Sequence, residues 1–74
     1  MNIFRENDVV RLRIGVEANI ITGDEVFIPK GAEGTVVIVH GNADQPSAYE
    51  VEFFISEQND FALATVDADL LCKV

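Results

Sequence analysis

The stretch that most constrains the fold is residues 29–41, which read PKGAEGTVVIVHG. Two glycines, Gly31 and Gly34, bracket an expected turn, because glycine reaches backbone angles that cost other residues energy. The β-branched run at residues 35–39 follows at once, and such residues fit a pleated strand but lose side-chain freedom in a helix. A second strand-like run begins at Ala48. Together these features predict a small, strongly bent β-barrel.

The pattern along the chain predicts five short strands. Residues 8–14 and 48–55 alternate apolar and polar side chains, as a half-buried strand does. Residues 35–40 are apolar on both faces, which predicts a strand in the middle of the sheet. The other two expected strands are residues 61–66 and 70–74.

The connections complete the predicted fold, an all-β, five-stranded SH3-like barrel formed as one domain by residues 1–74. Residues 16–28 are expected to form a long ordered first loop, or to include a short hairpin at the turn signal TGDE. Residues 41–47 should form a hairpin tip. Asp67 and Asp69 should cap a single helical turn before the last strand. A five-stranded OB-like barrel is the disfavoured alternative, since it needs more residues.

The charge balance bears on the partners. Thirteen acidic residues against five basic ones give a formal net charge of −8. Proteins that bind nucleic acid gain affinity by neutralising phosphates with Lys and Arg, so this charge argues against that class. Arg5, Arg11 and Arg13 leave room for a small basic patch near the N-terminus. The acidic surface favours a protein partner with a basic surface, or serves solubility alone.

Cys72 is the only cysteine, so no internal disulfide is expected, and a reducing, cytoplasmic location fits. No signal peptide pattern opens the sequence, and no apolar run is long enough for a transmembrane helix, so no membrane association is expected.

Four segments together resemble a known family. They are DVVRL at residues 8–12, PKGAEGTVV at 29–37, AYEVEF at 48–53, and ATV with DLL at 64–71. The chain resembles, over roughly residues 7–72, small bacterial proteins catalogued as a domain of unknown function, number 4926. The resemblance implies an SH3-like barrel and a genomic setting beside other small genes, some similar to toxin–antitoxin or immunity pairs. It implies no catalytic or ligand residues.

A looser resemblance rests on the spacing of Gly31, Gly34 and Val36. It is similar to the motif of KOW-type translation and transcription barrels. The overall layout is also similar to the SH3-like barrels of a photosystem subunit and of ferredoxin–thioredoxin reductase. These resemblances imply the same fold.

Catalytic and metal chemistry are not indicated, and neither an enzyme nor a cofactor is expected. His40 has acidic neighbours on the facing strand but no signalled nucleophile. Cys72 lies in an apolar context, which favours packing over reactivity. One Cys and one His cannot make a structural zinc site, and the acids lack the spacing of a calcium loop. Gly31 and Gly34 precede a strand, not the helix of a phosphate loop.

The acidic residues on the first loop, on the strand at 48–55 and on the following loop form the candidate partner-binding strip. Phe54 would anchor such an interface if it is exposed, and would belong to the core if the first loop covers it. The candidate partner-binding residues are Glu17, Asp24, Glu25, Glu50, Glu52, Phe54, Glu57 and Asp60.

Three functions are consistent with these features. The first is a non-enzymatic protein-interaction module, with an antitoxin-like or immunity-like role toward a neighbouring gene product as its concrete form. The second is an acidic mimic of nucleic acid, like phage-encoded inhibitors. The third is a KOW-like nucleic-acid-binding module, which the charge disfavours. The chain is expected to be a monomer, or a weak homodimer joined through its Arg11 and Arg13 face and its Glu50 and Glu52 face.

Overall fold

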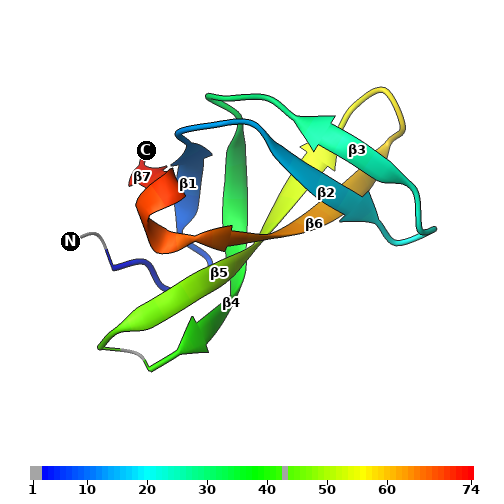
Figure 1. Cartoon of the computed structure of the whole chain (residues 1–74). Coiled ribbons are helices and arrows are strands. Elements are labelled where there is room, and N and C mark those ends of the chain that lie inside the picture. The colour runs from blue at the N-terminus through cyan, green and yellow to red at the C-terminus, as the bar shows by residue number, and fades with distance from the viewer. Residues whose placement is uncertain (1–2, 43) are drawn as a thin grey trace.

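The computed structural model describes residues 3–42 and 44–74, and these residues form one curled, half-barrel sheet of seven antiparallel strands (Figure 1). A single 3-10 turn, η1 (Ala68–Leu70), precedes the last strand. The strands are β1 (Val9–Leu12), β2 (Val16–Ile20), β3 (Glu25–Ile28), β4 (Glu33–Gly41), β5 (Pro46–Ile55), β6 (Asp60–Asp67) and β7 (Leu71–Lys73).

The strand order across the sheet is β3-β2-β6-β5-β4-β1-β7. The long strands β4, β5 and β6 form a meander at the centre, and Figure 1 shows β5 crossing the whole molecule. The β2–β3 hairpin extends the sheet beyond β6, while β1 and β7 extend it beyond β4. The all-β class and the helical turn before the last strand are therefore confirmed.

The inner face of the curled sheet holds the hydrophobic core. Along β5 the alternation expected from the sequence buries Tyr49, Val51 and Phe53. The facing positions of β6 are small or branched, with Ala62, Ala64 and Val66 in the register that pairs with β5. Large side chains on β5 thus lie beside small or branched ones on β6, which lets the two strands share one closely packed core. The other buried hydrophobic residues are Phe4, Val10, Leu12, Ala18, Ile20, Ile28, Val36 and Leu71.

The prediction of five strands is wrong, because residues 16–28 form a regular hairpin, β2–β3, and no long loop. The short hairpin that was the alternative at the turn signal TGDE is confirmed. The N–H of Gly23 donates to the carbonyl of Ile20, and the N–H of Ile20 donates to the carbonyl of Asp24. Gly23 has a φ of 102°, which a residue with a side chain rarely adopts. A turn closed by a left-handed glycine is a common three-residue hairpin connection, and it turns the two halves of the segment into paired strands.

Gly31 and Gly34 do not bracket one turn. Gly31 has a φ of 89° and makes the turn before β4, as expected. Gly34 already lies within β4, where it pairs with Val10 and is buried. Its lack of a side chain leaves room for Val51 and Phe53 of the neighbouring strand. The chain needs glycine at position 34 for close packing and not for a turn.

The first expected strand is shorter than residues 8–14. β1 ends at Leu12, and Ile14 is exposed although the alternation placed it with the core side chains. The carbonyl of Leu12 accepts a hydrogen bond from the N–H of Gly31, and the N–H of Leu12 donates to the carbonyl of Ala32. The N–H of Arg13 still donates to the carbonyl of Leu70, and the chain then bends at residues 13–14 before β2 begins.

β4 lies between β5 and β1, so its expected place inside the sheet is confirmed. The run of apolar residues in β4 does not mean that both faces of the strand are buried. Val36 pairs with Val51, but Ile38 pairs with Glu50, so Val37 is an extra residue at a β-bulge. The bulge places Ile38 on the solvent side, where it is 51% exposed.

The N-terminal segment before β1, for which the sequence predicted no structure, covers the core. Phe4 is buried, and its ring meets that of Tyr49 edge to face at 5.4 Å. The N–H of Phe4 donates to the buried Tyr49 hydroxyl at 2.9 Å. This contact gives the buried hydroxyl a hydrogen-bond partner far away in the sequence.

The helical turn is present, but the expected capping is not. Asp67 occupies the position before η1 without a side-chain hydrogen bond to it, so the prediction of an Asp67 cap is wrong. Asp69 lies inside the turn. The backbone of Leu71 instead donates to the carbonyl of Ala68, and this bond closes the turn. At the expected hairpin tip, Ala43 lies outside the described residues.

Candidate functional site

The solvent side of the central strands carries a mixed apolar and acidic surface, here called the outer face. Side chains alternate along a strand, so the residues between the core positions of β5 and β6 must share this side. The register places them in cross-strand pairs. The outer face consists of Ile38 on β4, Glu50, Glu52 and Phe54 on β5, and Phe61, Leu63 and Thr65 on β6.

Phe54 and Phe61 form an aromatic pair on the outer face. They are direct cross-strand partners, with ring centroids 5.2 Å apart and an interplanar angle of 63°. Phe54 is 54% exposed and Phe61 is 45% exposed. The prediction that Phe54 is exposed is therefore confirmed, and the alternative that the first loop buries it is wrong. Sequence analysis missed Phe61, although the alternation of β6 around its buried residues Ala62 and Ala64 placed it outward.

Glu52 lies near the middle of a row of residues that crosses the sheet. It pairs with Thr35 on one side and with Leu63 on the other. Leu63 pairs in turn with Asn19, and Asn19 pairs with Glu25. The register therefore brings Glu25 of β3 and Glu52 of β5 into the same row, separated by two strands.

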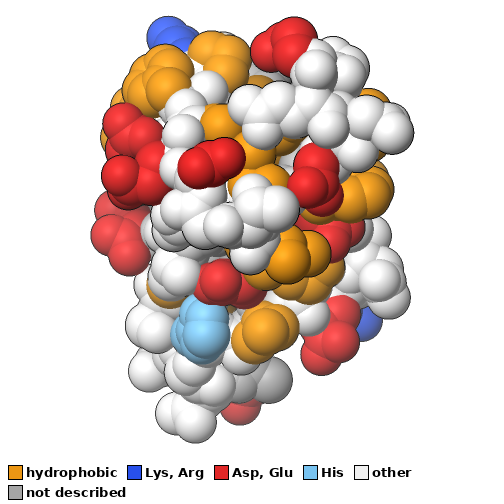
Figure 2. All heavy atoms as spheres, turned by 90° about the vertical axis from the view of Figure 1, so that its right-hand side faces the viewer, with side chains coloured by type: hydrophobic (Ala, Val, Ile, Leu, Met, Phe, Trp, Pro, Cys, Tyr) orange, Lys and Arg blue, Asp and Glu red, His pale blue; other side chains and the backbone are white. Residues whose placement is uncertain are grey.

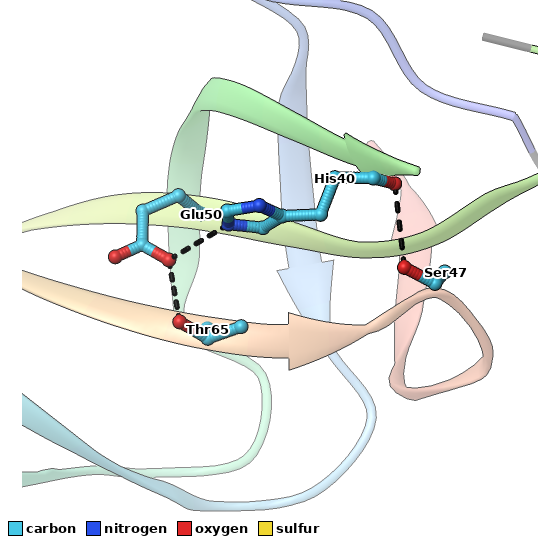
Figure 3. A network of polar contacts seen from close by, with 4 residues as sticks. All are labelled: His40, Ser47, Glu50 and Thr65. Atoms are coloured by element: carbon cyan, nitrogen blue, oxygen red, sulfur yellow. Dashed lines mark hydrogen bonds and ion pairs between the residues drawn. The ribbon is translucent and has the colours of Figure 1, made fainter. Parts of the chain in front are cut away.

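Glu50 is the polar centre of the outer face (Figure 3). Its Oε1 accepts a hydrogen bond from the hydroxyl of Thr65 on the partner strand. His40 Nε2 lies 3.5 Å from the same oxygen. The His40 carbonyl also accepts from the Ser47 hydroxyl at 3.4 Å. Because the carboxylate lies between the hydroxyl and the imidazole, the imidazole is not placed to take the Thr65 proton.

The remaining acids of the predicted strip lie on the hairpin and at the β5–β6 turn. Glu17 of β2 pairs with Phe27 of β3, and Asp24 lies in the exposed turn between these strands. Asp60 accepts a hydrogen bond from the N–H of Phe61 at 2.8 Å, so its carboxylate stabilises the start of β6. Glu57 lines a separate pocket beside Phe54. The structure thus places Glu50, Glu52 and Phe54 together and distributes the other acids around them.

The surface view shows how the charges and apolar groups mix. In Figure 2, acidic side chains lie among apolar ones, and the histidine lies beside an acidic group on the same side of the molecule. Exposed apolar side chains outside the core are numerous in this small protein, and Ile21 in the β2–β3 turn is 82% exposed. Aromatic side chains are enriched at protein interfaces relative to the rest of the surface.

The basic residues near the N-terminus are partly engaged. Arg11 donates to Glu33 at 2.8 Å, and this hydrogen bond, with the charge of Glu33, raises the pKa of Arg11 above its usual value. Arg13 donates through Nε to the carbonyl of Leu71 at 3.2 Å. Arg11 is therefore paired with an acidic residue of the same chain at the surface.

In the part of the chain that the structure describes, Cys72 and the acidic side chains are not grouped into a metal site. The Cys72 sulfur is half-buried and lies 3.5 Å from the Arg11 carbonyl, to which it donates. Within residues 3–42 and 44–74, no three side chains of His, Cys, Asp or Glu are grouped to hold a metal ion. In the same part of the chain no helix has the length and apolar character to cross a membrane.

Comparisons with known proteins found no relative. No model of a protein family, no curated protein and no solved structure matches the chain.

Proposed function

We propose that this protein is a non-enzymatic interaction module whose outer face binds a basic surface of a partner protein. The observation that carries the proposal is the exposed pair Phe54 and Phe61, which stands beside the carboxylates of Glu50 and Glu52. Aromatic side chains are favoured anchors at the centres of protein interfaces. Acids around an aromatic anchor select a partner that brings Lys or Arg to the same contact.

The strand connectivity supports an SH3-like barrel as the finer description of the fold. A first strand is followed by a hairpin, a three-stranded meander, a 3-10 turn and a last strand that returns beside the first. The resemblance to the small bacterial family of unknown function supports the same fold. An antitoxin-like role toward the product of a neighbouring gene is the concrete form that the resemblance favours.

A partner protein suits this charge better than a nucleic acid does. The net charge of −8 repels phosphates, and Arg11 is paired with Glu33. Competition for the basic nucleic-acid channel of another protein remains a second form of the same proposal. It would use the same outer face, because that face combines the exposed aromatic pair with carboxylates.

The test is capture of partners from a lysate of the source cells with immobilised protein at physiological ionic strength. We expect a specific partner that Phe54→Ala with Phe61→Ala loses, and that Glu50→Lys with Glu52→Lys also loses. Ile14→Ala is the matched control, since Ile14 is comparably exposed but lies outside the outer face. A partner retained by both double variants, or capture only of basic proteins that moderate salt removes, would contradict the proposal.

A further inference from the structure

β3 lies at one end of the sheet, and one of its edges is unpaired. In the described part of the chain β3 pairs with β2 alone. A pocket of about 230 Å³ is lined by residues of β3 and of the end of β5, together with Pro29, Ala32 and Glu33. The half-barrel therefore stays open along a seam between its end strand and its central strand.

The backbone of β3 alternates in the direction of its hydrogen bonds. Ile20 and Asp24 form a hydrogen-bonded pair at the turn, and the register continues with Ala18 opposite Val26. In an antiparallel ladder, hydrogen-bonded pairs alternate with pairs that do not bond each other. The N–H and carbonyl groups of Glu25 and Phe27 therefore point away from β2, toward the open edge.

Apolar and acidic residues line the pocket. The apolar ones include Val26, Ile28, Phe53, Phe54 and Ile55, and the acidic ones are Glu33 and Glu57. Of these two carboxylates, that of Glu33 is paired with Arg11. No lysine, arginine or histidine is among the described residues that line it. Its volume lies below the roughly 300–1,000 Å³ of clefts that hold drug-sized ligands, so it suits one side chain of a longer chain.

We infer that an extended, basic segment of the partner adds to the sheet as a further strand beside β3. Its backbone pairs with Glu25 and Phe27, an apolar side chain enters the pocket, and a neighbouring Lys or Arg side chain meets Glu57. Strand addition of this kind takes affinity from backbone hydrogen bonds and specificity from the alternating side chains. The inference rests on the proposed function, and Phe54 belongs to both surfaces.

A second copy of this chain fits the edge poorly. Two copies would each bring a net charge of −8, and both edges would carry Glu25. Like charges opposite each other destabilise a strand pair. A basic segment instead supplies the opposite charge.

The probe is a short peptide of alternating lysine and valine, titrated into isotope-labelled protein and followed by the amide spectrum. We expect the largest shifts at Glu25, Phe27 and Glu57, and slower hydrogen exchange at the amides of Glu25 and Phe27. Two control peptides separate the contribution of the backbone hydrogen bonds from that of the charge. An N-methylated version that lacks alternate N–H groups and a version with glutamate in place of lysine should both bind at least about tenfold more weakly.

Phe27→Pro is the decisive variant. Proline is tolerated on an edge strand where the N–H faces away from the ladder, so the hairpin should keep its fold while the edge loses a donor. We expect about tenfold weaker peptide binding than for Phe27→Ala, which removes the same ring but keeps the N–H. If Phe27→Pro fails to fold, the N-methylated peptide on the unchanged protein tests the same bond.

Several results would overturn the inference: no binding of the alternating peptide, equal binding of the N-methylated peptide, or amide shifts confined to the outer face. These results leave the proposed function intact if the cellular partner is still lost with Phe54→Ala and Phe61→Ala. Binding that brings two protein copies together in light scattering would show a dimer edge instead. A partner that both double variants still capture, together with the expected peptide binding, would contradict the proposed function alone.

Discussion

The ring of Phe53 occupies the space that a side chain at Gly34 would need. A Cβ at position 34 would lie 2.8 Å from two ring carbons of Phe53 and 2.7 Å from Cγ1 of Val51. Real Cβ atoms essentially never approach heavy atoms this closely. Both neighbours are buried on β5, so neither can move aside freely.

Gly34→Ala should therefore lower the free energy of unfolding by about 1–3 kcal/mol, the usual cost of overpacking a core. Urea denaturation followed by circular dichroism measures the change. Gly15→Ala is the matched control, because its added Cβ meets only the end of the Phe27 ring, which is exposed and free to swing out. Its cost should stay below about 1 kcal/mol. Equal losses in both variants would argue against close packing at Gly34.

Tyr49→Phe should destabilise the protein by about 1–3 kcal/mol, since it leaves the N–H of Phe4 buried without an acceptor. The ring-to-ring contact stays in this variant, so the change isolates the hydroxyl. Hydrogen exchange at the Phe4 amide should accelerate by more than the global loss of stability explains. An unchanged exchange rate would show that the N-terminal segment does not depend on this bond.

The aromatic pair on the outer face should contribute little to stability. Single changes Phe54→Ala and Phe61→Ala remove partly solvated rings, and a double-mutant cycle should give a coupling energy of about 0.5–1.5 kcal/mol. All of these variants should remain folded, which the lysate experiment requires. A coupling energy near zero would mean that the rings do not hold this geometry in solution.

Salt should stabilise this protein. The acidic side chains repel one another in the folded protein, because they outnumber the basic ones. Raising the salt concentration from about 0.01 M to 0.15 M shortens the Debye screening length from about 30 Å to 8 Å and so weakens this repulsion. The midpoint of thermal unfolding should rise over this range, and Glu52→Lys should make the rise smaller. A falling midpoint would mean that favourable pairs such as Arg11 with Glu33 outweigh the repulsion.

The candidate site was predictable where alternation alone places a side chain. The outward direction of Glu50, Glu52 and Phe54 follows from the burial of the residues between them. The partner of Phe54 did not follow, because pairing with Phe61 depends on the register of two strands and the length of their turn. The row from Glu52 to Glu25 likewise depends on the packing of a hairpin beside β6.

The all-β class, the turn at Gly31 and the helical turn before the last strand all follow from the amino-acid sequence, as does the turn signal of the β2–β3 hairpin. These features are local, since φ angles, β-branched side chains and alternation act within a few residues. The assembled sheet sets the other features: the pairing of β2 with β6, the bulge at Val37, the packing of Phe53 against Gly34 and the open edge of β3. Each of these depends on which distant strand lies alongside, and the free energy of those contacts is set by the assembled sheet.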